Sequence, residues 1–295
     1  MRKQKMLPRQ PSPLVDAPSL SAALGHRDLV LLDASFDLAD PAAGERAWAE
    51  GHLPGARYAH LERDLSGPKQ ALGPSFTGRH PLPTRTAFAA TAGGWGIAPT
   101  RLVVVMDRQG GPYAARLWWM LRWLGHSRVW VLDGGVEAWR SAGGALTSEA
   151  PAAVAPLPPY PARATGLPTI SVDALARALG RVQLIDARPG ERFRGEVEPL
   201  DSVAGHIPGA LNRPFKDNLD AANGLFKPPE QLAREFGALL SNRAPGAVVH
   251  QCGSGVTACH NLLAMQAAGM DGGSLYAGSW SEWSANPARP VARGG

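Results

Sequence analysis

Hydrophobic residues in this chain form short apolar runs that alternate with longer stretches of helical periodicity. The runs at 29–32, 102–105 and 129–132 consist mostly of valine and leucine and have the length of buried strands. The stretch 114–124, between the last two runs, has the length and spacing of a helix. Such alternation is typical of a mainly parallel sheet wrapped by helices, so we predict an α/β fold.

The same pattern occurs twice along the chain. Leu-Leu-Asp-Ala at 31–34 returns as Leu-Ile-Asp-Ala at 184–187, and Gly-His-Leu-Pro-Gly-Ala at 51–56 returns as Gly-His-Ile-Pro-Gly-Ala at 205–210. Two further pairs follow in the same order, Asp107 with Cys252 and Trp139 with Trp283. Collinear matches of this kind indicate a tandem duplication. His52 and His206 recur at the same place in both copies, so we expect them to support a turn.

The two copies predict two domains joined by a linker. The segment 145–168 contains six prolines and has no periodic apolar pattern, which favours an extended connection. We therefore predict a first domain at 14–144, a linker at 145–168 and a second domain at 169–287.

Composition limits the classes of function. The 295 residues with 44% hydrophobic content can form two packed cores. The net charge is +5, but lysine and arginine are scattered, which favours a small anionic substrate over nucleic acid.

No apolar run follows the basic residues 1–10, and none has membrane-spanning length, so we predict no membrane association and a cytoplasmic location. Two cysteines, Cys252 and Cys259, are too few for a disulfide framework and wrongly spaced for zinc, so we predict no metal.

The strongest candidate for chemistry is Cys252, which lies where an apolar run at 247–249 ends and a helical pattern at 257–268 begins. Gly253 and Gly255 allow successive backbone N–H groups to turn inward, and a helix N-terminus adds partial positive charge. Both effects stabilise a thiolate. The alternative is that Cys252 is a small buried apolar residue.

The sequence Cys-Gly-Ser-Gly-Val-Thr-Ala at 252–258 resembles the active-site loop of the sulfurtransferase (rhodanese) superfamily, and of 3-mercaptopyruvate sulfurtransferases in particular. Thiosulfate-specific members usually carry basic residues directly after the cysteine, whereas Gly253 and Ser254 are uncharged. A phosphatase loop needs an arginine six residues after the cysteine, and Ala258 stands there. The resemblance implies two tandem rhodanese-like domains, each a mainly parallel sheet flanked by helices. Because Asp107 cannot accept sulfur, the first domain is expected to be catalytically silent.

Two arginines are candidates for binding the donor. Arg188 and Arg192 are four residues apart, so a helical turn would place both guanidinium groups on one face. By resemblance, Arg192 occupies the position that binds the donor anion; pairing with nearby glutamates on a solvated surface is the alternative. Relatives that use mercaptopyruvate usually add a second arginine where this chain has Leu200. Arg188 is the candidate for that missing contact.

For proton transfer, the resemblance implies a serine, a histidine and an acid. These correspond to Ser254, His80 in the sequence Arg-His-Pro-Leu-Pro, and Glu62, with Asp64 as the alternative acid. The loop backbone is expected to bind the donor at Gly253, Gly255, Val256 and Thr257.

We therefore predict a sulfurtransferase that moves sulfane sulfur from 3-mercaptopyruvate, through a persulfide on Cys252, to cyanide, a small thiol or a thioredoxin-type acceptor. No metal or organic cofactor is expected. One alternative keeps the mechanism and uses thiosulfate as donor. Another is a sulfur-carrier module without catalysis, which would need a docking tail or a relay cysteine, and Cys259 inside the following helix has the pattern of a core residue.

Overall fold

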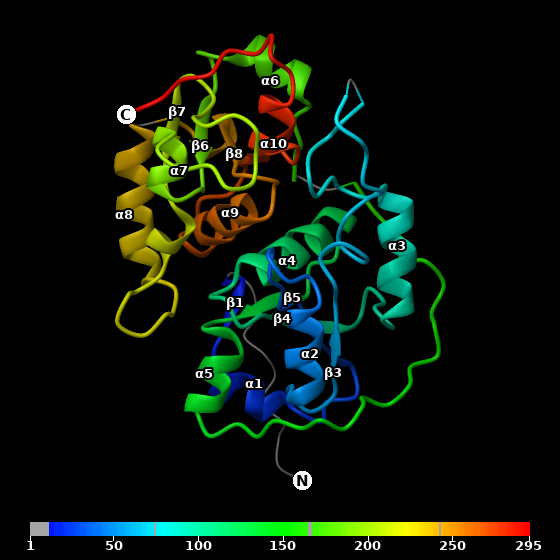
Figure 1. Ribbon diagram of the computed structural model, residues 1–295. Coiled ribbons are helices and arrows are strands. Elements are labelled where there is room, and N and C mark those ends of the chain that lie inside the picture. The colour runs from blue at the N-terminus through cyan, green and yellow to red at the C-terminus, as the bar shows by residue number, and fades with distance from the viewer. Residues whose placement is uncertain (1–11, 74, 165–166, 242) are drawn as a thin grey trace. The chain divides into compact units, whose positions relative to one another are not determined.

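The computed structural model describes residues 12–73, 75–164, 167–241 and 243–295 (Figure 1). The basic stretch 1–10 and residues 165–166 of the predicted linker lie outside these residues. Along the described part of the linker, Leu157 N donates to Gly93 O and Tyr160 N donates to Ala89 O, at 3.0 and 2.8 Å. The described part of the linker has no helix and bonds to helix α3 (Arg85–Gly94) of the domain that precedes it.

The chain divides into two compact units that exchange short segments. The first unit comprises the described residues of 1–65, 83–165 and 220–226, and the second those of 66–82, 166–219 and 227–295. The predicted continuous domains did not include this exchange. Its main consequence is that residues 66–82, which precede the linker in sequence, belong to the unit that contains Cys252.

The first unit contains a five-stranded parallel sheet in the order β1-β5-β4-β2-β3. Its strands are β1 (Leu14–Val15), β2 (Leu29–Asp33), β3 (Ala56–Tyr58), β4 (Leu102–Met106) and β5 (Val129–Leu132). Its helices are α1 (Ala17–Ala23), α2 (Ala43–Glu50), α3 (Arg85–Gly94), α4 (Pro112–Leu124) and α5 (Gly135–Ser141). The predicted run at 129–132 matches β5, and the runs at 29–32 and 102–105 each extend by one residue.

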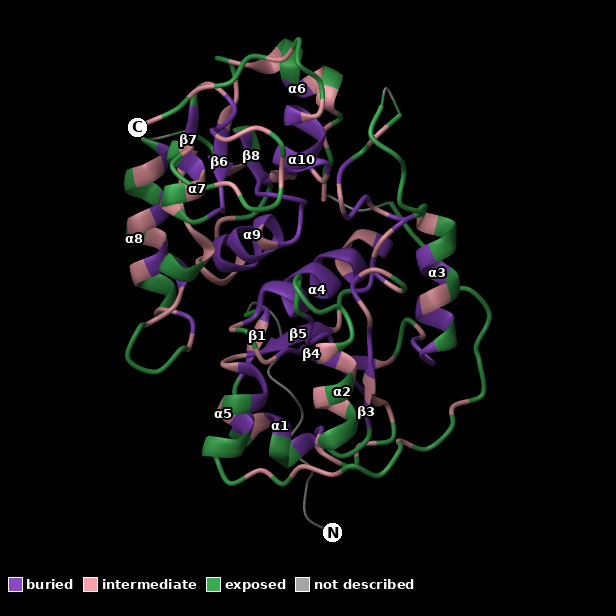
Figure 2. Ribbon diagram, viewed as in Figure 1, coloured by how far each residue is buried: buried purple, intermediate pink, exposed green. Residues whose placement is uncertain are grey.

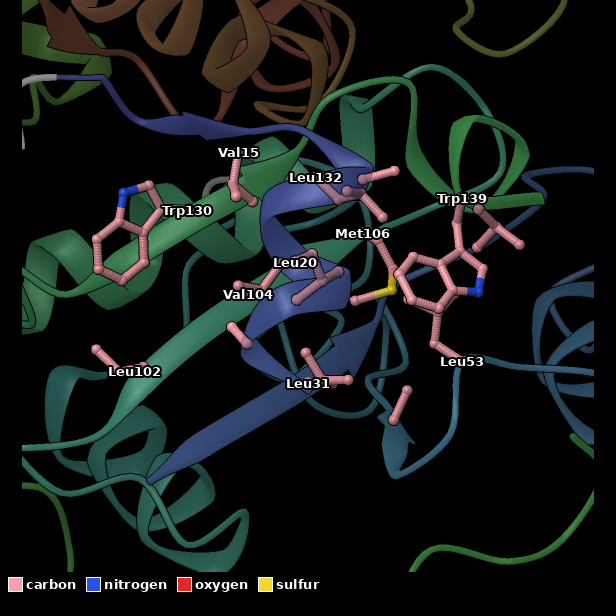
Figure 3. Packing of buried hydrophobic residues seen from close by; sticks show 14 residues of the cluster. Val15, Leu20, Leu31, Leu53, Leu102, Val104, Met106, Trp130, Leu132 and Trp139 are labelled. Atoms are coloured by element: carbon pink, nitrogen blue, oxygen red, sulfur yellow. The ribbon is translucent and has the colours of Figure 1, made fainter. Parts of the chain in front are cut away.

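Alternation along the strands divides the core of the first unit between the two faces of its sheet. Leu31 of β2 and Val104 of β4 pack with Leu20 of α1 and Trp139 of α5 on one face (Figure 3). Val105 lies next to Val104 on β4, points to the opposite face and is fully buried. Strands buried on both faces explain why the sequence shows continuous apolar runs rather than polar alternation.

The second unit repeats this architecture with a four-stranded parallel sheet in the order β7-β6-β8-β9. Its strands are β6 (Gln183–Asp186), β7 (Ala210–Asn212), β8 (Val248–Gln251) and β9 (Ser274–Leu275). Its helices are α6 (Val172–Ala178), α7 (Gly190–Arg194), α8 (Pro229–Leu240), α9 (Thr257–Ala267) and α10 (Ser279–Ser284), with 3-10 turns η1 (Phe215–Asn218) and η2 (Pro245–Ala247). The predicted fold class is confirmed.

Helix exposure differs between the elements that flank the central strands. Figure 2 shows α4 and α9 buried along most of their length, whereas α3 and α8 alternate buried and exposed positions. Helix α4 includes Trp118 and Trp119, which are 1% and 0% exposed. Their burial agrees with the core role that helical spacing of aromatic residues predicts.

The two repeated histidines have matching structural roles. Nδ1 of His52 lies 2.7 Å from Trp48 O, and Nδ1 of His206 lies 2.8 Å from Phe193 O. Each imidazole also stacks on that aromatic ring, with centroid distances of 4.4 and 3.8 Å. Both histidines therefore fix the chain entering a strand, as the repetition predicts.

Among the described residues, no helix is long and apolar enough to cross a membrane. The same residues contain no group of three or more histidine, cysteine, aspartate or glutamate side chains arranged to hold a metal ion.

Candidate active site

Cys252 is the first residue after β8, at the carboxyl end of a central strand of the second sheet. Its side chain is in a buried position, with 2% of the residue exposed. Gly255 N lies 3.1 Å from Sγ and donates to it, and Cys252 N donates to Ser279 Oγ at 3.1 Å. The sulfur therefore accepts a backbone N–H from its own loop, which is one of the features that stabilise a thiolate.

Gly255 is required by its backbone conformation and by space, whereas an added Cβ at Gly253 would meet the flexible ends of arginine side chains. Gly255 has a φ of +76°, and a Cβ there would lie 2.4 Å from Ala277 O. At Gly253 a Cβ would lie 2.9 Å from Nη2 of Arg79. Helix α9 begins directly after Val256, which provides no side-chain cap, so the predicted backbone donors of Val256 and Thr257 lie at an uncapped helix N-terminus.

Ser254 and His80 form a buried pair within the second unit. Ser254 Oγ and His80 Nδ1 are hydrogen-bonded at 2.8 Å, and the residues are 5% and 4% exposed. His80 reaches this position because the segment 66–82 belongs to the second unit. The structure thus brings together two of the residues predicted for proton transfer, and a hydroxyl bonded to an imidazole can pass a proton along the pair.

Arg192 lies beside the same loop. A Cβ added to Gly253 would lie 3.6 Å from its Nη1 and 3.8 Å from its Nη2. Its guanidinium also pairs with Glu198 and, at 3.5 Å, with Asp201. These two carboxylates are 4% and 7% exposed, so they are buried anchors rather than solvated partners. They fix the orientation of Arg192 next to the loop.

Arg188 is placed differently from the sequence prediction. It precedes α7 rather than sharing a helical turn with Arg192, and its side chain is 1% exposed. Its guanidinium donates to both carboxylate oxygens of Asp186, and also to Glu198 and to the Gly205 carbonyl. It stacks over the Trp280 ring at 4.8 Å. Arg188 thus donates to protein groups and is linked to Arg192 through Glu198, which both arginines bond.

The two candidate acids lie in the first unit, after β3. Asp64 accepts from His60 N at 2.7 Å and pairs with Arg63 at 3.2 Å. Glu62 N donates to Nδ1 of His60 at 3.1 Å. Asp64 therefore holds its own turn, and both Glu62 and Asp64 remain candidates for the acid.

Both cysteines are free thiols. Cys259 is fully buried in α9 and its Sγ donates to Gly255 O at 3.4 Å. This placement agrees with the core role that its position in the helical pattern predicts.

The fold and the loop define a class of protein with two homologous α/β domains, one of which has a cysteine on a loop that leads into a helix N-terminus. Residues 16–142 and 171–286 both match the model of the rhodanese-like domain. The chain belongs to this family. It is 48% identical over 288 residues to a probable 3-mercaptopyruvate sulfurtransferase of Pseudomonas aeruginosa, covering 95% of this chain and 98% of that protein.

Two other similar proteins differ in the sulfur donor that their names give. A putative thiosulfate sulfurtransferase, SseB, of Mycobacterium tuberculosis is 40% identical over 95% of this chain and 97% of its own length. The solved structure of 3-mercaptopyruvate sulfurtransferase from Leishmania major superposes with a TM-score of 0.80 at 29% identity, covering 94% of this chain and 75% of that one. Both donors are thus named among the relatives.

Sequence reasoning missed Arg79, Asp201 and Ser279. Arg79 is adjacent to His80 in the segment that the resemblance identified, so its position was a usable signal. Asp201 directly follows Leu200, and nothing in the local sequence marks it as a partner of two arginines. The role of Ser279 depends on its backbone conformation, which the sequence does not show.

Proposed function

We propose that this chain is a sulfurtransferase that takes sulfur from 3-mercaptopyruvate and transfers it, through a persulfide on Cys252, to a thiol, thioredoxin-type or cyanide acceptor. One observation carries the proposal. A hydrogen-bonded pair, Ser254 and His80 at 2.8 Å, belongs to the same loop environment as the buried Cys252. A mercaptoketone donor requires proton transfer, and this pair supports it.

In the first step the Cys252 thiolate attacks the thiol sulfur of 3-mercaptopyruvate. The new bond is Sγ–S, the S–C bond breaks, and its electron pair leaves as the enolate of pyruvate. The loop backbone donors at Gly255, Val256 and Thr257 and the Arg192 guanidinium are the groups that bind the anionic donor. No oxidant or metal enters this balance.

The proton in this step moves from the transferred S–H to the carbon of the enolate, which yields pyruvate. Ser254 and His80 are proposed to relay this proton. The resemblance of the sequence proposes Glu62 as the acid of this relay, with Asp64 as the alternative. Arg188 is proposed as a positioning residue, because it holds the Glu198 carboxylate that in turn bonds Arg192.

In the second step an acceptor thiolate attacks the outer sulfur of the persulfide. A new persulfide forms on the acceptor, and the Cys252 thiolate is restored. With cyanide the product is thiocyanate. Two free cysteines are compatible with a reducing compartment, and we propose the cytoplasm as the site of action.

Thiosulfate is the second candidate donor. Attack on its outer sulfur releases sulfite and transfers no proton, so Ser254 and His80 have no essential role in that reaction. Two guanidinium groups beside Gly253, from Arg79 and Arg192, suit a dianion. The 40% identical relative named as a putative thiosulfate sulfurtransferase also favours this alternative.

Measuring both donors on one preparation tests the proposal. Intact mass after a single addition of donor should show a gain of one sulfur atom on the wild-type chain and none on Cys252→Ser. Steady-state turnover with cyanide should then favour 3-mercaptopyruvate over thiosulfate. A higher kcat/KM for thiosulfate would replace the proposed donor, and sulfur loading of Cys252→Ser would remove the proposed nucleophile.

A further inference from the structure

We propose that the second unit has a further ligand site, a pocket at the end of α10 that binds a free α-amino acid with an apolar side chain. The cavity has a volume of about 420 Å³, which is within the range of small-molecule sites. Its lining comes mainly from residues 75–77, the first turn of α6 and the segment 282–289, all in one unit. Among the described residues, those that line this pocket do not include the loop 252–257 or Arg192.

Two carboxylates face this cavity. Glu282 of α10 is 9% exposed, and Asp173 of α6 lies across the pocket lining from it. Within the described ranges, neither of them forms an ion pair with another side chain. Burial raises the pKa of the Glu282 carboxyl, Tyr276 and Arg289 oppose this shift, and the charge of Asp173 adds to it. An ammonium group between the two acids would relieve their repulsion and supply N–H donors to both.

Arg289 provides the opposite charge on the same lining. Its Nη1 donates to Glu282 O at 2.6 Å and lies 3.4 Å from Trp283 O, so this nitrogen fixes the guanidinium to the backbone of α10. No acceptor among the described residues is bonded to its Nε or Nη2. These two nitrogens form the fork through which arginine binds a carboxylate.

The rest of the lining is partly apolar. Phe76 and Val172 are half-buried and face the cavity together with Pro287. A ligand that matches the whole pocket therefore has an ammonium group for Glu282 and Asp173, a carboxylate for Arg289 and an apolar group for these walls. A free α-amino acid has all three, whereas a simple amine or a simple acid would leave one charged side of the pocket without a partner.

The pocket shares a wall with the segment that carries His80. Thr77 lines the cavity and is followed by Gly78, which has a φ of +101° and approaches Gly278, where a Cβ would lie 2.7 Å from the carbonyl oxygen. Arg79 N then donates to Ser281 Oγ of α10 at 3.1 Å. A ligand in the pocket would thus contact the two elements, segment 75–77 and α10, whose pairing holds His80 in place.

The test compares three probes that differ only in their charged groups. L-leucine has both groups, isopentylamine is leucine without the carboxylate, and 4-methylpentanoate is leucine without the ammonium. Isothermal titration calorimetry on the full chain, with no sulfur donor present, should show that leucine binds at least about tenfold more tightly than either of the other two. Each of these lacks one charge-assisted contact.

Four variants locate the binding. Glu282→Gln and Asp173→Asn should each weaken leucine binding at least about fivefold. Asp173 is exposed, so Asp173→Asn decides the question if Glu282→Gln does not fold. Glu230→Gln is the matched control, because Glu230 is the acid in the first turn of α8 as Asp173 is in α6, and it should keep the wild-type affinity. Arg192→Gln should keep it too, since Arg192 belongs to the active loop.

Three results would overturn the proposal. The first is a wild-type chain that shows no saturable binding of leucine. The second is isopentylamine binding as tightly as leucine, which would show that no carboxylate is recognised. The third is a loss in Arg192→Gln as large as that in Asp173→Asn, which would place leucine at the active loop. None of these measurements depends on the sulfur donor, so they leave the proposed function to its own test.

Discussion

The loop after β4 in the first unit and the loop after β8 in the second unit have related backbones and different contents. Each has a left-handed glycine three residues after the position of the nucleophile, Gly110 with a φ of 86° and Gly255 with a φ of 76°. In the second unit that position is Cys252, and in the first it is Asp107. The duplication thus preserved the shape of the loop in both domains.

In the first unit the loop binds its own carboxylate. Asp107 Oδ1 accepts from the backbone N–H groups of Gln109 and Gly111 at 2.9 and 2.8 Å, and Oδ2 accepts from Tyr113 and Ala114 at 2.9 Å. Burial raises the pKa of the Asp107 carboxyl, and these four bonds oppose that shift. The comparison teaches that the backbone of this loop holds an acidic side chain in the first unit, at the position where the second unit has Cys252.

The largest effect is expected from removing the nucleophile of the second loop. Cys252→Ser should lower turnover with either donor by more than about a thousandfold, because a hydroxyl is not ionised at neutral pH and does not hold sulfane sulfur. Steady-state rates measure this loss. The free energy of unfolding in urea should change little, because the substitution keeps the hydrogen bond from the backbone N of residue 252 to Ser279 Oγ. Retained turnover would show that another group attacks the donor.

The matching substitution in the first loop should act on stability instead. Asp107→Asn replaces one acceptor oxygen by a donor and leaves two backbone N–H groups without an acceptor, which costs about 3 kcal/mol, or roughly a hundredfold in the folding equilibrium. Urea unfolding followed by tryptophan fluorescence measures it. Turnover per folded molecule should stay within about twofold of wild type. A loss of turnover without a loss of stability would contradict the silent role of this domain.

A third substitution tests whether the serine of the second loop transfers a proton. Ser254→Ala should slow 3-mercaptopyruvate turnover by about a hundredfold and thiosulfate turnover far less, because only the first donor needs proton transfer. Gln109, the counterpart of Ser254 in the first loop, provides the control, and Gln109→Ala should leave both rates unchanged. Equal losses on both donors in Ser254→Ala would favour the thiosulfate alternative.

A converse substitution at the same loop tests donor choice directly. Gly253→Arg combined with Ser254→Lys adds the basic residues that thiosulfate-specific relatives carry, and should shift the ratio of the two kcat/KM values towards thiosulfate. The space beside Arg79 is small at this position, with 2.9 Å to a Cβ, so circular dichroism must first show that the variant is folded. An unchanged ratio in a folded variant would mean that these residues do not set the preference.

Much of the fold followed from local patterns, and the segment exchange did not. The apolar runs at 102–105 and 129–132 predicted β4 and β5 because central parallel strands are buried on both faces. Assigning 66–82 to the second unit depends on contacts between residues far apart in sequence, such as Arg79 with Asp201, and no local pattern encodes them. The same limit explains Arg188, whose carboxylate partners become evident only after folding.

The smallest effect is expected at the residue that supports the backbone of Cys252. Ser279 has a φ of 55°, a left-handed conformation that is unfavourable for serine, and its Oγ accepts from Cys252 N at 3.1 Å and donates to Tyr276 O at 2.9 Å. The counterpart in the first unit is Gly135, with a φ of 58°. The active loop therefore has a strained hydroxyl residue where the silent loop has glycine.

Two substitutions at this position separate the hydroxyl from the strain. Ser279→Gly and Ser279→Ala both remove the bond to Cys252 N, so both should lower kcat by about fivefold through a less constrained nucleophile. Ser279→Ala keeps the left-handed Cβ and should be less stable than Ser279→Gly by about 1 kcal/mol. Steady-state kinetics and urea unfolding of the pair measure the two effects. If kcat is unchanged in both variants, the hydroxyl has no part in orienting Cys252, and the strain at Ser279 has no catalytic purpose in this loop.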